Sequence, residues 1–146
     1  MKYHVYGIGN ALVDIVTEVG DNFLEVHEIE KGLMTLVDAD RQFQLVEAIN
    51  LKESNRQCGG SAANTVIAAS QFGAECYYSC LVADDDMGHF YLKDLRANNV
   101  STNMNSDVLP KGITGKCLVM TTPDAGRTMN TFLGITSSFS RSQIHP

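Results

Sequence analysis

The sequence predicts an α/β fold, built as a layered sheet with helices, together with a second and smaller β-sheet. Two observations predict it. Short runs enriched in β-branched residues alternate with segments of helical period, which is typical of a layered α/β sheet. Further strand-like segments around the turn at 123–126 do not fit this alternation, so we expect them to form the smaller sheet.

The composition is that of one folded domain. The chain has 146 residues, 44% of them hydrophobic, which excludes a disordered chain. No stretch approaches the roughly 20 apolar residues of a membrane-spanning helix, and the N-terminus lacks the pattern of a signal peptide. The net charge is −6 and there is no basic run, so we expect no nucleic-acid partner and no binding to an anionic membrane.

The N-terminal part carries signals for three strands and two helical segments. Residues 3–9 predict a strand that ends in glycines, and residues 11–19 predict a second strand rich in β-branched side chains. Residues 38–51 have apolar side chains at helical spacing, and Asp38 or Asp40 can cap that helix. The other segments are a helical turn at 21–26, a strand at 33–37 and a polar loop at 52–58.

The rest of the chain predicts two strand–helix pairs and then a hairpin. A glycine loop after Cys58 leads into a helix of small residues that Gly73 closes, and a buried strand follows at 76–83. Three acidic residues open the next helix, which ends near Asn98, because negative charge stabilises a helix N-terminus. Strands follow at 100–109, 115–122 and 127–133. Residues 140–143 resemble the start of another helix, so we expect the sequence to be the front part of a longer protein; a frayed C-terminus is the alternative.

Three familiar kinds of motif are incomplete. Gly7 and Gly9 begin a dinucleotide-binding fingerprint, but its third glycine would fall at Leu12, where the chain continues as strand instead of helix. The stretch 112–116 lacks the spacing of a phosphate-binding loop. The histidines and the four cysteines form no metal-ligand pattern, so we expect no metal site in this chain, and buried or half-buried thiols in a reducing cytoplasm.

Two places in the sequence combine polar chemistry with apolar or glycine-rich surroundings. Asp14 lies within an apolar strand run, where it either accepts hydrogen bonds from ligand hydroxyls or is a half-exposed residue of an alternating strand. Gly59 and Gly60 precede a helix in which Asn64 lies one turn inside, so they allow either close approach of a ligand or close packing of the helix on a sheet. Carboxylate and amide groups both bind hydroxyls, and together Asp14 and Asn64 indicate recognition of a polyol.

In combination these features resemble the N-terminal half of the PfkB, or ribokinase-like, family of sugar and nucleoside kinases. The matching pieces occur in the family's order: Gly-Ile-Gly-Asn-Ala-Leu-Val-Asp at 7–14, Gly-Gly-Ser-Ala-Ala-Asn at 59–64, Val-Ala-Asp-Asp-Asp-Met-Gly at 82–88 and Gly-Arg-Thr at 126–128. The helix at 38–51 and the stretch 9–14 resemble the adenosine-kinase-like branch. The resemblance implies a three-layer α/β/α sheet with a small β-sheet lid, whose strands we expect at about 12–20, 33–37 and 100–122.

The resemblance also implies roles for individual residues. Asp14 would bind two hydroxyls of the acceptor, and Asn64 would bind another. Gly59 and Gly60 would form the hinge between the main domain and the lid and would contact the sugar through their backbone. The other residues with an implied role are Asn10 and Leu12 in the acceptor pocket, Met34 in the lid, and Arg127 at the transferred phosphate.

The chain departs from the family pattern in three ways. Val66 stands where a small residue is usual, and Ala83 stands where Gly is usual. The family's second signature, Asp-Thr-x-Gly-Ala-Gly-Asp, which supplies an anion hole and the catalytic base, does not occur in these 146 residues. We therefore expect no catalytic residue in this chain, ATP and Mg²⁺ bound mainly by a missing C-terminal half, and no kinase activity from the chain alone.

Two functional hypotheses follow from the resemblance. The first is an ATP-dependent phosphotransferase that acts on a hydroxymethyl group of a sugar or nucleoside, with this chain carrying the acceptor-binding half. The alternative is a non-catalytic sugar- or nucleoside-binding module, or a lid-dimerisation module, because lid sheets in this family either pair into homodimers or stay single.

Overall fold

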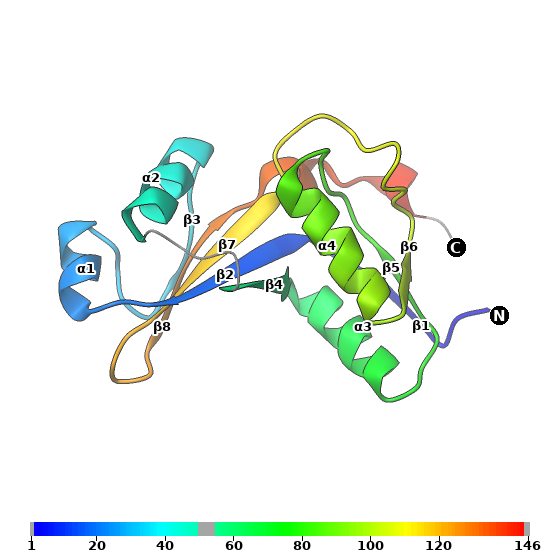
Figure 1. Ribbon diagram of the computed structural model, residues 1–146, viewed down its shortest axis with the longest axis horizontal. Coiled ribbons are helices and arrows are strands. Elements are labelled where there is room, and N and C mark those ends of the chain that lie inside the picture. The colour runs from blue at the N-terminus through cyan, green and yellow to red at the C-terminus, as the bar shows by residue number, and fades with distance from the viewer. Residues whose placement is uncertain (1, 50–54, 145–146) are drawn as a thin grey trace. The chain divides into compact units, whose positions relative to one another are not determined.

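The computed structural model describes residues 2–49 and 55–144, which divide into two compact units (Figure 1). Unit 1 consists of Met1–Val13, Gln57–Gly115 and Leu133–Pro146, and unit 2 consists of Asp14–Arg56 and Lys116–Phe132. The units are thus interleaved along the sequence. No helix in the described ranges is long and apolar enough to cross a membrane.

Unit 1 is built on a parallel sheet of three strands. Its order is β1 (Val5–Ile8), β5 (Cys76–Ser79) and β6 (Val100–Thr102), and each neighbouring pair runs parallel. Helix α3 (Ser61–Gln71) precedes β5 in the chain, and α4 (Asp86–Ala97) precedes β6. Parallel neighbours need such crossover helices, so the expected strand–helix alternation is confirmed here.

Both helices of unit 1 lie on one face of this sheet. A Cβ atom added at Gly7 would lie 2.6 Å from Cγ1 of Val66 on α3, so the glycine makes room for the larger side chain. Tyr78 pairs with Gly7 across the sheet and is fully buried, and the fully buried Tyr91 of α4 is its neighbour. The unusual Val66 is therefore accommodated by a strand residue that has no side chain.

The start of α4 is fixed by one aspartate. Asp85 is the N-cap, and its Oδ1 accepts a hydrogen bond from the backbone N–H of Gly88 at 2.8 Å. The same carboxylate accepts bonds from the backbone N–H and the hydroxyl of Thr114, at 2.8 and 2.6 Å. In the acidic motif at 82–88, Asp85 thus connects a helix start to the chain that enters β7.

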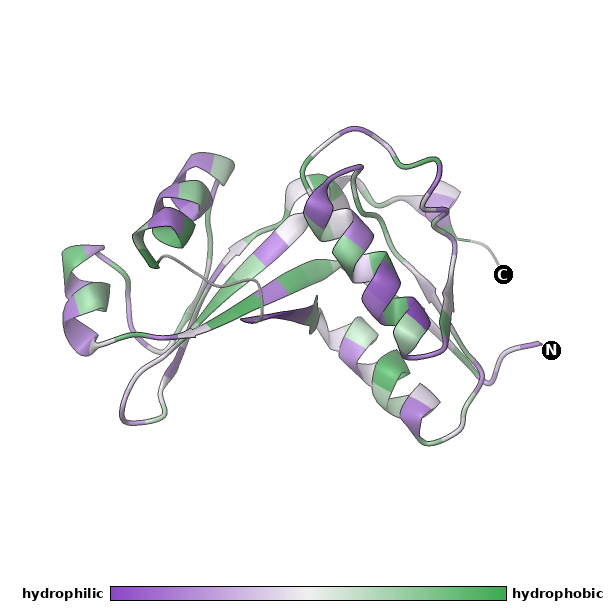
Figure 2. Cartoon of the chain, in the orientation of Figure 1, coloured by the Kyte–Doolittle hydropathy of each residue, from purple (hydrophilic) through white to green (hydrophobic). Residues whose placement is uncertain are grey.

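Unit 2 contains most residues of a mixed sheet. The strand order is β3 (Met34–Leu36), β8 (Arg127–Phe132), β7 (Gly115–Thr121), β2 (Leu12–Glu18) and β4 (Arg56–Gly59). Most of β4 and the first residues of β2 and β7 belong to unit 1. Strands β7 and β8 form an antiparallel hairpin, whereas β3 runs parallel to β8. Helices α1 (Asp21–Val26) and α2 (Ala39–Ile49) complete the unit. Figure 2 shows strand β2 mostly in the hydrophobic colour, interrupted by a hydrophilic band.

The β7–β8 turn is held by charge. Lys31 Nζ donates to Asp124 Oδ2 at 2.8 Å and to Asp21 Oδ1 at 2.6 Å, so one ammonium connects the turn to the start of α1. Asp124 also accepts hydrogen bonds from the Thr122 hydroxyl and the backbone N–H of Gly126. These contacts hold the pKa of the Asp124 carboxyl well below its usual value, and the hydrogen bond from Lys31 has the largest effect.

Two expected boundaries differ from the structure. The range 100–122 was expected to contribute lid strands, but Val100–Thr102 pairs with β5 in the parallel sheet, and only Gly115–Thr121 belongs to the mixed sheet. Val100 follows a crossover helix and is buried, which places its strand beside the preceding one. The predicted polar loop at 52–58 lies partly outside the described residues, and Arg56–Gly59 forms β4. The predicted terminal helix appears as a 3₁₀ turn at Arg141–Gln143 with a capping box from Ser140.

Candidate functional site

Two chain segments of unit 1 meet at the carboxyl end of β1. Gly60 has φ +95°, and a Cβ atom there would lie 2.4 Å from the backbone oxygen of Asn10. At Gly9, an added Cβ would lie 2.8 Å from the Cβ of Ala62 on the first turn of α3. A side chain does not fit at either position, because it would meet the backbone of Asn10 at Gly60 and the side chain of Ala62 at Gly9. The structure thus brings Asn10 and Gly60, two predicted site residues, into contact.

Two side chains of α4 hold the backbone of the glycine loop at residues 58–60. The buried hydroxyl of Tyr91 donates to the backbone oxygen of Gly59 at 3.0 Å. One residue earlier, the backbone N–H of Cys58 donates to Oδ2 of Asp94 at 3.1 Å. The backbone before Gly60 is therefore held by two side chains of one helix, which fixes the position of the glycine pair.

We expect Tyr91→Phe to destabilise the protein by about 1–2 kcal/mol, because the buried carbonyl of Gly59 then loses its donor. Urea unfolding monitored by far-UV circular dichroism measures this loss. Tyr6→Phe is the matched control, since the Tyr6 hydroxyl bonds to Ser79 at a partly exposed position and its removal should cost less. Equal losses of unfolding free energy in the two variants would show that the hydrogen bond from Tyr91 to Gly59 stabilises the protein no more than the bond between Tyr6 and Ser79 does.

The loop that carries Asn10 is fixed from the C-terminal part of unit 1. The hydroxyl of the buried residue Thr136 accepts a hydrogen bond from the backbone N–H of Ala11 at 3.1 Å and lies 3.5 Å from Oδ1 of Asn10. Tyr78 donates its hydroxyl proton to the backbone oxygen of Asn10 at 3.2 Å. The backbone of the loop is thus held on both sides, while Asn10 itself is exposed.

Asn64 and Leu12 also belong to unit 1. Asn64 lies in α3, where its backbone N–H donates to the oxygen of Gly60 at 3.0 Å and its side chain is exposed. Leu12 begins β2 and is half-buried, and its Cδ2 lies 2.7 Å from where a Cβ at Gly115 would be. The amide of Asn64 therefore extends from the helix that the glycine loop opens.

Asp14 belongs to unit 2, near the start of β2. It is half-buried, and burial raises the pKa of its carboxyl to about 6, although the positive charge of Arg127 acts in the opposite direction. Its neighbours Val13 and Ile15 are buried. A carboxylate in this position is poorly solvated, so hydrogen-bond donors supplied by a ligand would stabilise its charge.

Asp14 has a thiol and a cation among its neighbours in unit 2. The buried Cys117 accepts a hydrogen bond from the hydroxyl of Thr131 at 3.2 Å. Burial raises the pKa of the Cys117 thiol, and the negative charge of Asp14 raises it further. Arg127, at the start of β8, is exposed and is the cation whose field reaches both groups. The mixed sheet thus brings Asp14 and Arg127 within electrostatic reach of one another.

Met34 lies at the start of the edge strand β3. It pairs with Met129 of β8, and its side chain is 55% exposed. All three residues of β3 are exposed. Met34 is therefore available for contact with a ligand or with another chain.

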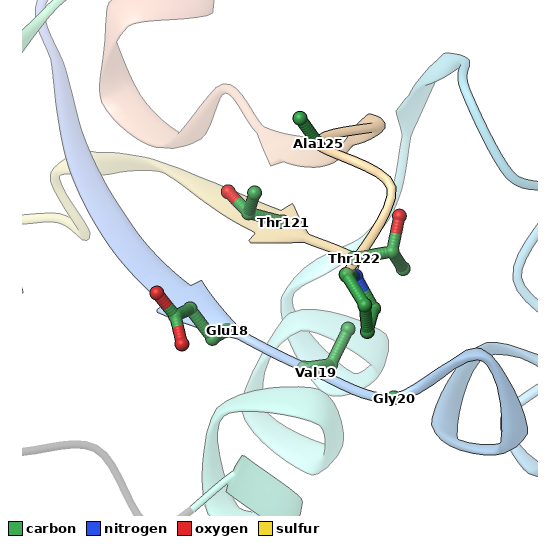
Figure 3. Close-up of a pocket in the computed structure, with 7 residues that line it drawn as sticks. Glu18, Val19, Gly20, Thr121, Thr122 and Ala125 are labelled. Carbon is green, nitrogen blue, oxygen red and sulfur yellow. The ribbon is translucent and has the colours of Figure 1, made fainter.

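A cavity of about 610 Å³ in unit 2 lies away from these residues (Figure 3). It is lined by the end of β2 and by the β7–β8 turn, and the backbone N–H of Val19 donates to the oxygen of Thr121 there at 3.0 Å. Glu18 is its one charged lining residue, and Figure 3 shows the Glu18 carboxylate directed away from the turn. None of the predicted site residues lines this cavity, so it is not the candidate site.

The described residues offer no group of three or more His, Cys, Asp or Glu side chains that could hold a metal ion. All four cysteines are buried and none of them forms a disulfide within the described residues.

Comparison with known proteins decides the family. Residues 29–145 match the family described as pfkB family carbohydrate kinase. The chain belongs to the PfkB family. The adenosine kinase from Sinorhizobium meliloti has 34% sequence identity to this PfkB chain and superposes with a TM-score of 0.87 over 99% of it. A probable sugar kinase from Rhizobium etli gives 31% identity and the same TM-score over the same share.

These matches confirm the ribokinase-like α/β fold and the likeness to adenosine kinases. An adenosine kinase from Schistosoma mansoni, solved with adenosine bound, superposes with a TM-score of 0.81 at 24% identity, which supports the fold alone. The PfkB chain spans about 43% of the length of the first two structures and 42% of the third.

Sequence reasoning missed the residues that hold the site's backbone. Tyr78, Tyr91 and Thr136 place polar groups against Asn10, Ala11 and Gly59. A tyrosine in an otherwise apolar strand or helix needs a partner for its hydroxyl, and this was the available signal. Such a tyrosine indicates that its hydroxyl is hydrogen-bonded, but it does not show which segment of the chain supplies the acceptor.

Proposed function

We propose that the full-length natural gene product is an ATP-dependent phosphotransferase acting on a hydroxymethyl group of a nucleoside or sugar, and that this chain binds the acceptor. The observation that carries the proposal is Asp14. It is a half-buried carboxylate within an apolar strand, and burial raises its pKa to about 6. Such a group is stabilised by hydroxyl donors from a ligand, and a vicinal pair of hydroxyls supplies two.

The other predicted site residues support the same class of ligand. Asn64 is exposed, so its amide is accessible to a hydroxyl of the acceptor. The narrow approach at Gly60 and Asn10 keeps side chains away from the first turn of α3, which favours contact with the ligand through the backbone of Gly59 and Gly60.

ATP and Mg²⁺ are the cosubstrate and metal that PfkB membership implies. Bound ATP would supply the phosphoryl group, and Mg²⁺ would neutralise its charge. Of this chain's residues, Arg127 fits a contact to the transferred phosphate, because its guanidinium is exposed and planar. The acidic groups of the described residues do not cluster as metal ligands, so we infer that Mg²⁺ is held outside this chain.

The choice between nucleoside and sugar follows the comparisons. The adenosine kinase of S. meliloti and the probable sugar kinase of R. etli resemble this chain about equally, at 34% and 31% identity. The helix α2 supports the adenosine-kinase-like branch, so we propose a nucleoside such as adenosine as the first acceptor to test. The four buried thiols, which form no disulfide among the described residues, suit a reducing cytoplasm, where we place the protein.

The exposed edge of unit 2 supports the second candidate, a lid-dimerisation module. Leu33, Met34 and Leu36 are 47%, 55% and 59% exposed on or beside the edge strand β3. An apolar edge strand is a surface at which two copies can pair. Sedimentation of the 146-residue chain tests this, and a monomer at tens of micromolar would contradict it.

The test of the proposed function separates binding from chemistry. Calorimetric titration of the full-length gene product with adenosine, ribose and fructose, and a coupled assay for ADP, should show acceptor binding and turnover. The 146-residue chain alone should show no turnover, because it lacks the family's second signature. Asn64→Ala should weaken acceptor binding several-fold, whereas Gln71→Ala, an exposed control on the same helix, should not. Absence of binding to every acceptor, or turnover by the 146-residue chain, would contradict the proposal.

A further inference from the structure

The acidic motif at 82–88 directs one of its three carboxylates inward. Asp84 and Asp86 are exposed, whereas Asp85 is half-buried. Besides capping α4, Asp85 accepts a hydrogen bond from the backbone N–H of Thr114 on Oδ2 at 2.8 Å, and one from the Thr114 hydroxyl on Oδ1 at 2.6 Å. A helix cap needs only one carboxylate oxygen, so the two bonds to Thr114 indicate a second role for Asp85.

The hydroxyl of Thr114 has a partner on each side. It donates to Asp85, and it accepts a hydrogen bond from the backbone N–H of Ala83 at 3.0 Å. Thr114 is fully buried, so its polar groups depend on these partners within the protein. The bonds to the carboxylate are charge-assisted and therefore stronger than bonds between neutral groups. Together these contacts hold Thr114 in a fixed position relative to the start of α4.

Two backbone segments of unit 1 lie in direct contact beside Thr114. The N–H of Ile135 donates to the backbone oxygen of Ile113 at 2.8 Å. A Cβ atom added at Gly115 would lie 2.5 Å from the backbone oxygen of Leu133. Because no side chain lies between the two backbones, none can rotate to absorb a shift, and a displacement of Thr114 is passed to the second segment.

This second segment carries the residue that holds the loop at Asn10. Thr136 is fully buried, and its hydroxyl accepts a hydrogen bond from the backbone N–H of Ala11 at 3.1 Å and donates one to Oδ1 of Asn10 at 3.5 Å. The first segment contacts the same loop, since a Cβ atom at Gly115 would lie 3.1 Å from the backbone oxygen of Ala11. The position of the loop at Asn10 therefore depends on both segments.

We propose that Asp85 is a positioning residue for acceptor binding, which acts through Thr114 and Thr136 on the loop at Asn10. The proposal rests on the proposed function, because it takes Asn10 as part of the acceptor pocket. A carboxylate suits this role, since it accepts hydrogen bonds on both oxygens, whereas an amide would place an N–H group against one of the donors. A loop that is fixed before the acceptor arrives loses less conformational freedom on binding.

Hydrogen exchange in the full-length gene product tests this connection without any ligand. In Asp85→Asn, the amide of Ala11 should exchange with deuterium at least tenfold faster, whereas the amide of Asn64, which is bonded to Gly60, should change less than twofold. Asp86→Asn is the matched control, because Asp86 is an exposed acid of the same motif and should leave both amides unchanged. A loss of overall stability alone would accelerate exchange at both amides.

A double-mutant cycle tests whether Asp85 acts through Thr136. In Thr136→Val the amide of Ala11 has already lost its acceptor, so adding Asp85→Asn should accelerate its exchange less than twofold further. Should Asp85→Asn lose its cooperative melt, Thr114→Val takes its place. Thr114→Ser keeps the hydroxyl and should restore the exchange rate of the native protein.

Steady-state kinetics of the full-length gene product supply the functional measurement. Asp85→Asn should raise KM for the acceptor at least fivefold, while KM for ATP stays within twofold of the native value. A merely structural role would reduce the amount of active protein and would leave both KM values unchanged.

Several results would overturn the proposal. They are an unchanged exchange rate at Ala11, equal acceleration at Ala11 and Asn64, full additivity in the cycle, and an unchanged KM for the acceptor. A native gene product that turns over no acceptor would instead contradict the proposed function, while the exchange measurements still decide whether Asp85 positions the loop at Asn10.

Discussion

Asp14→Asn should weaken acceptor binding by on the order of 100-fold or more in the full-length gene product, and should also make the protein more stable at neutral pH. The first effect follows from the loss of charge-assisted hydrogen bonds to two hydroxyls, each worth about 1.5–3 kcal/mol. ATP affinity should change much less, since Asp14 is assigned to the acceptor. Calorimetry with adenosine and with ATP measures both effects, and equal losses would count against the assignment.

The stability effect depends on pH in a defined direction. Burial raises the pKa of the folded carboxyl from its usual 3.8 to about 6. Below about pH 4 both states are protonated, and burial of the carboxyl carries no charge penalty. Between about pH 4 and pH 6 the unfolded chain releases its proton first, so the stability contributed by this group falls as the pH rises, and above pH 6 the full penalty is present.

The expected gain at pH 7 is about 1–2 kcal/mol. The raised pKa corresponds to about 3 kcal/mol, and solvent screening of the half-exposed carboxylate lowers that value. Urea unfolding of the native protein and of Asp14→Asn at pH 4, 5, 6 and 7 measures the difference. Glu18→Gln is the matched control, because Glu18 is an exposed acid on the same strand and should change neither binding nor stability. A difference that does not grow between pH 4 and pH 6 would contradict this account of Asp14.

Gly60→Ala is expected to be among the most destabilising single-methyl substitutions in the chain. Its φ of +95° costs a residue with a side chain about 1–3 kcal/mol. In addition, the new Cβ would lie 2.4 Å from the backbone oxygen of Asn10, and displacing that backbone costs about 1–3 kcal/mol more. The loop at Asn10 should shift, so acceptor binding should also weaken.

Gly73→Ala separates the two contributions. Gly73 has φ +91°, close to that of Gly60, but nothing lies within 4 Å of an added Cβ. Gly73→Ala should therefore lose only the stability that the unfavourable backbone conformation costs. Chemical unfolding of both variants measures the difference. Equal losses of unfolding free energy would show that the close approach of Asn10 to Gly60 adds nothing to the cost of the Gly60 substitution.

Most of the order of helices and strands could be predicted from the sequence, because local turn and capping residues mark where these elements begin and end. Helix α3 was predictable because a glycine pair precedes it and Gly73 closes it, and the β7–β8 hairpin because of its Pro-Asp-Ala-Gly turn. The range 100–122 was less predictable, because a short apolar run has the same pattern in a parallel sheet as in a hairpin sheet. Only the crossover through α4 assigns Val100 to the former.

The candidate site was predictable in part. The sequence placed Gly60 and Asn10 in motifs, and the structure brings them into contact. It could not show that Tyr91 and Thr136 hold their backbones, because those hydrogen bonds join residues 32 and 125 positions apart. It also left open whether Asp14 is buried or exposed, since strand alternation does not determine what covers each face.

The hydrogen bond from Ala11 to Thr136 has a consequence for how the protein is made. Unit 1 is assembled from three separated stretches, and the last one begins at Leu133. A chain emerging from the ribosome therefore synthesises the loop at Asn10 well before the hydroxyl that fixes it. Contacts between such distant residues form slowly, so the loop at Asn10 lacks this hydrogen bond until synthesis passes Thr136. Premature termination before that residue should yield a polypeptide that chaperones retain or proteases remove, whatever the quality of its remaining core.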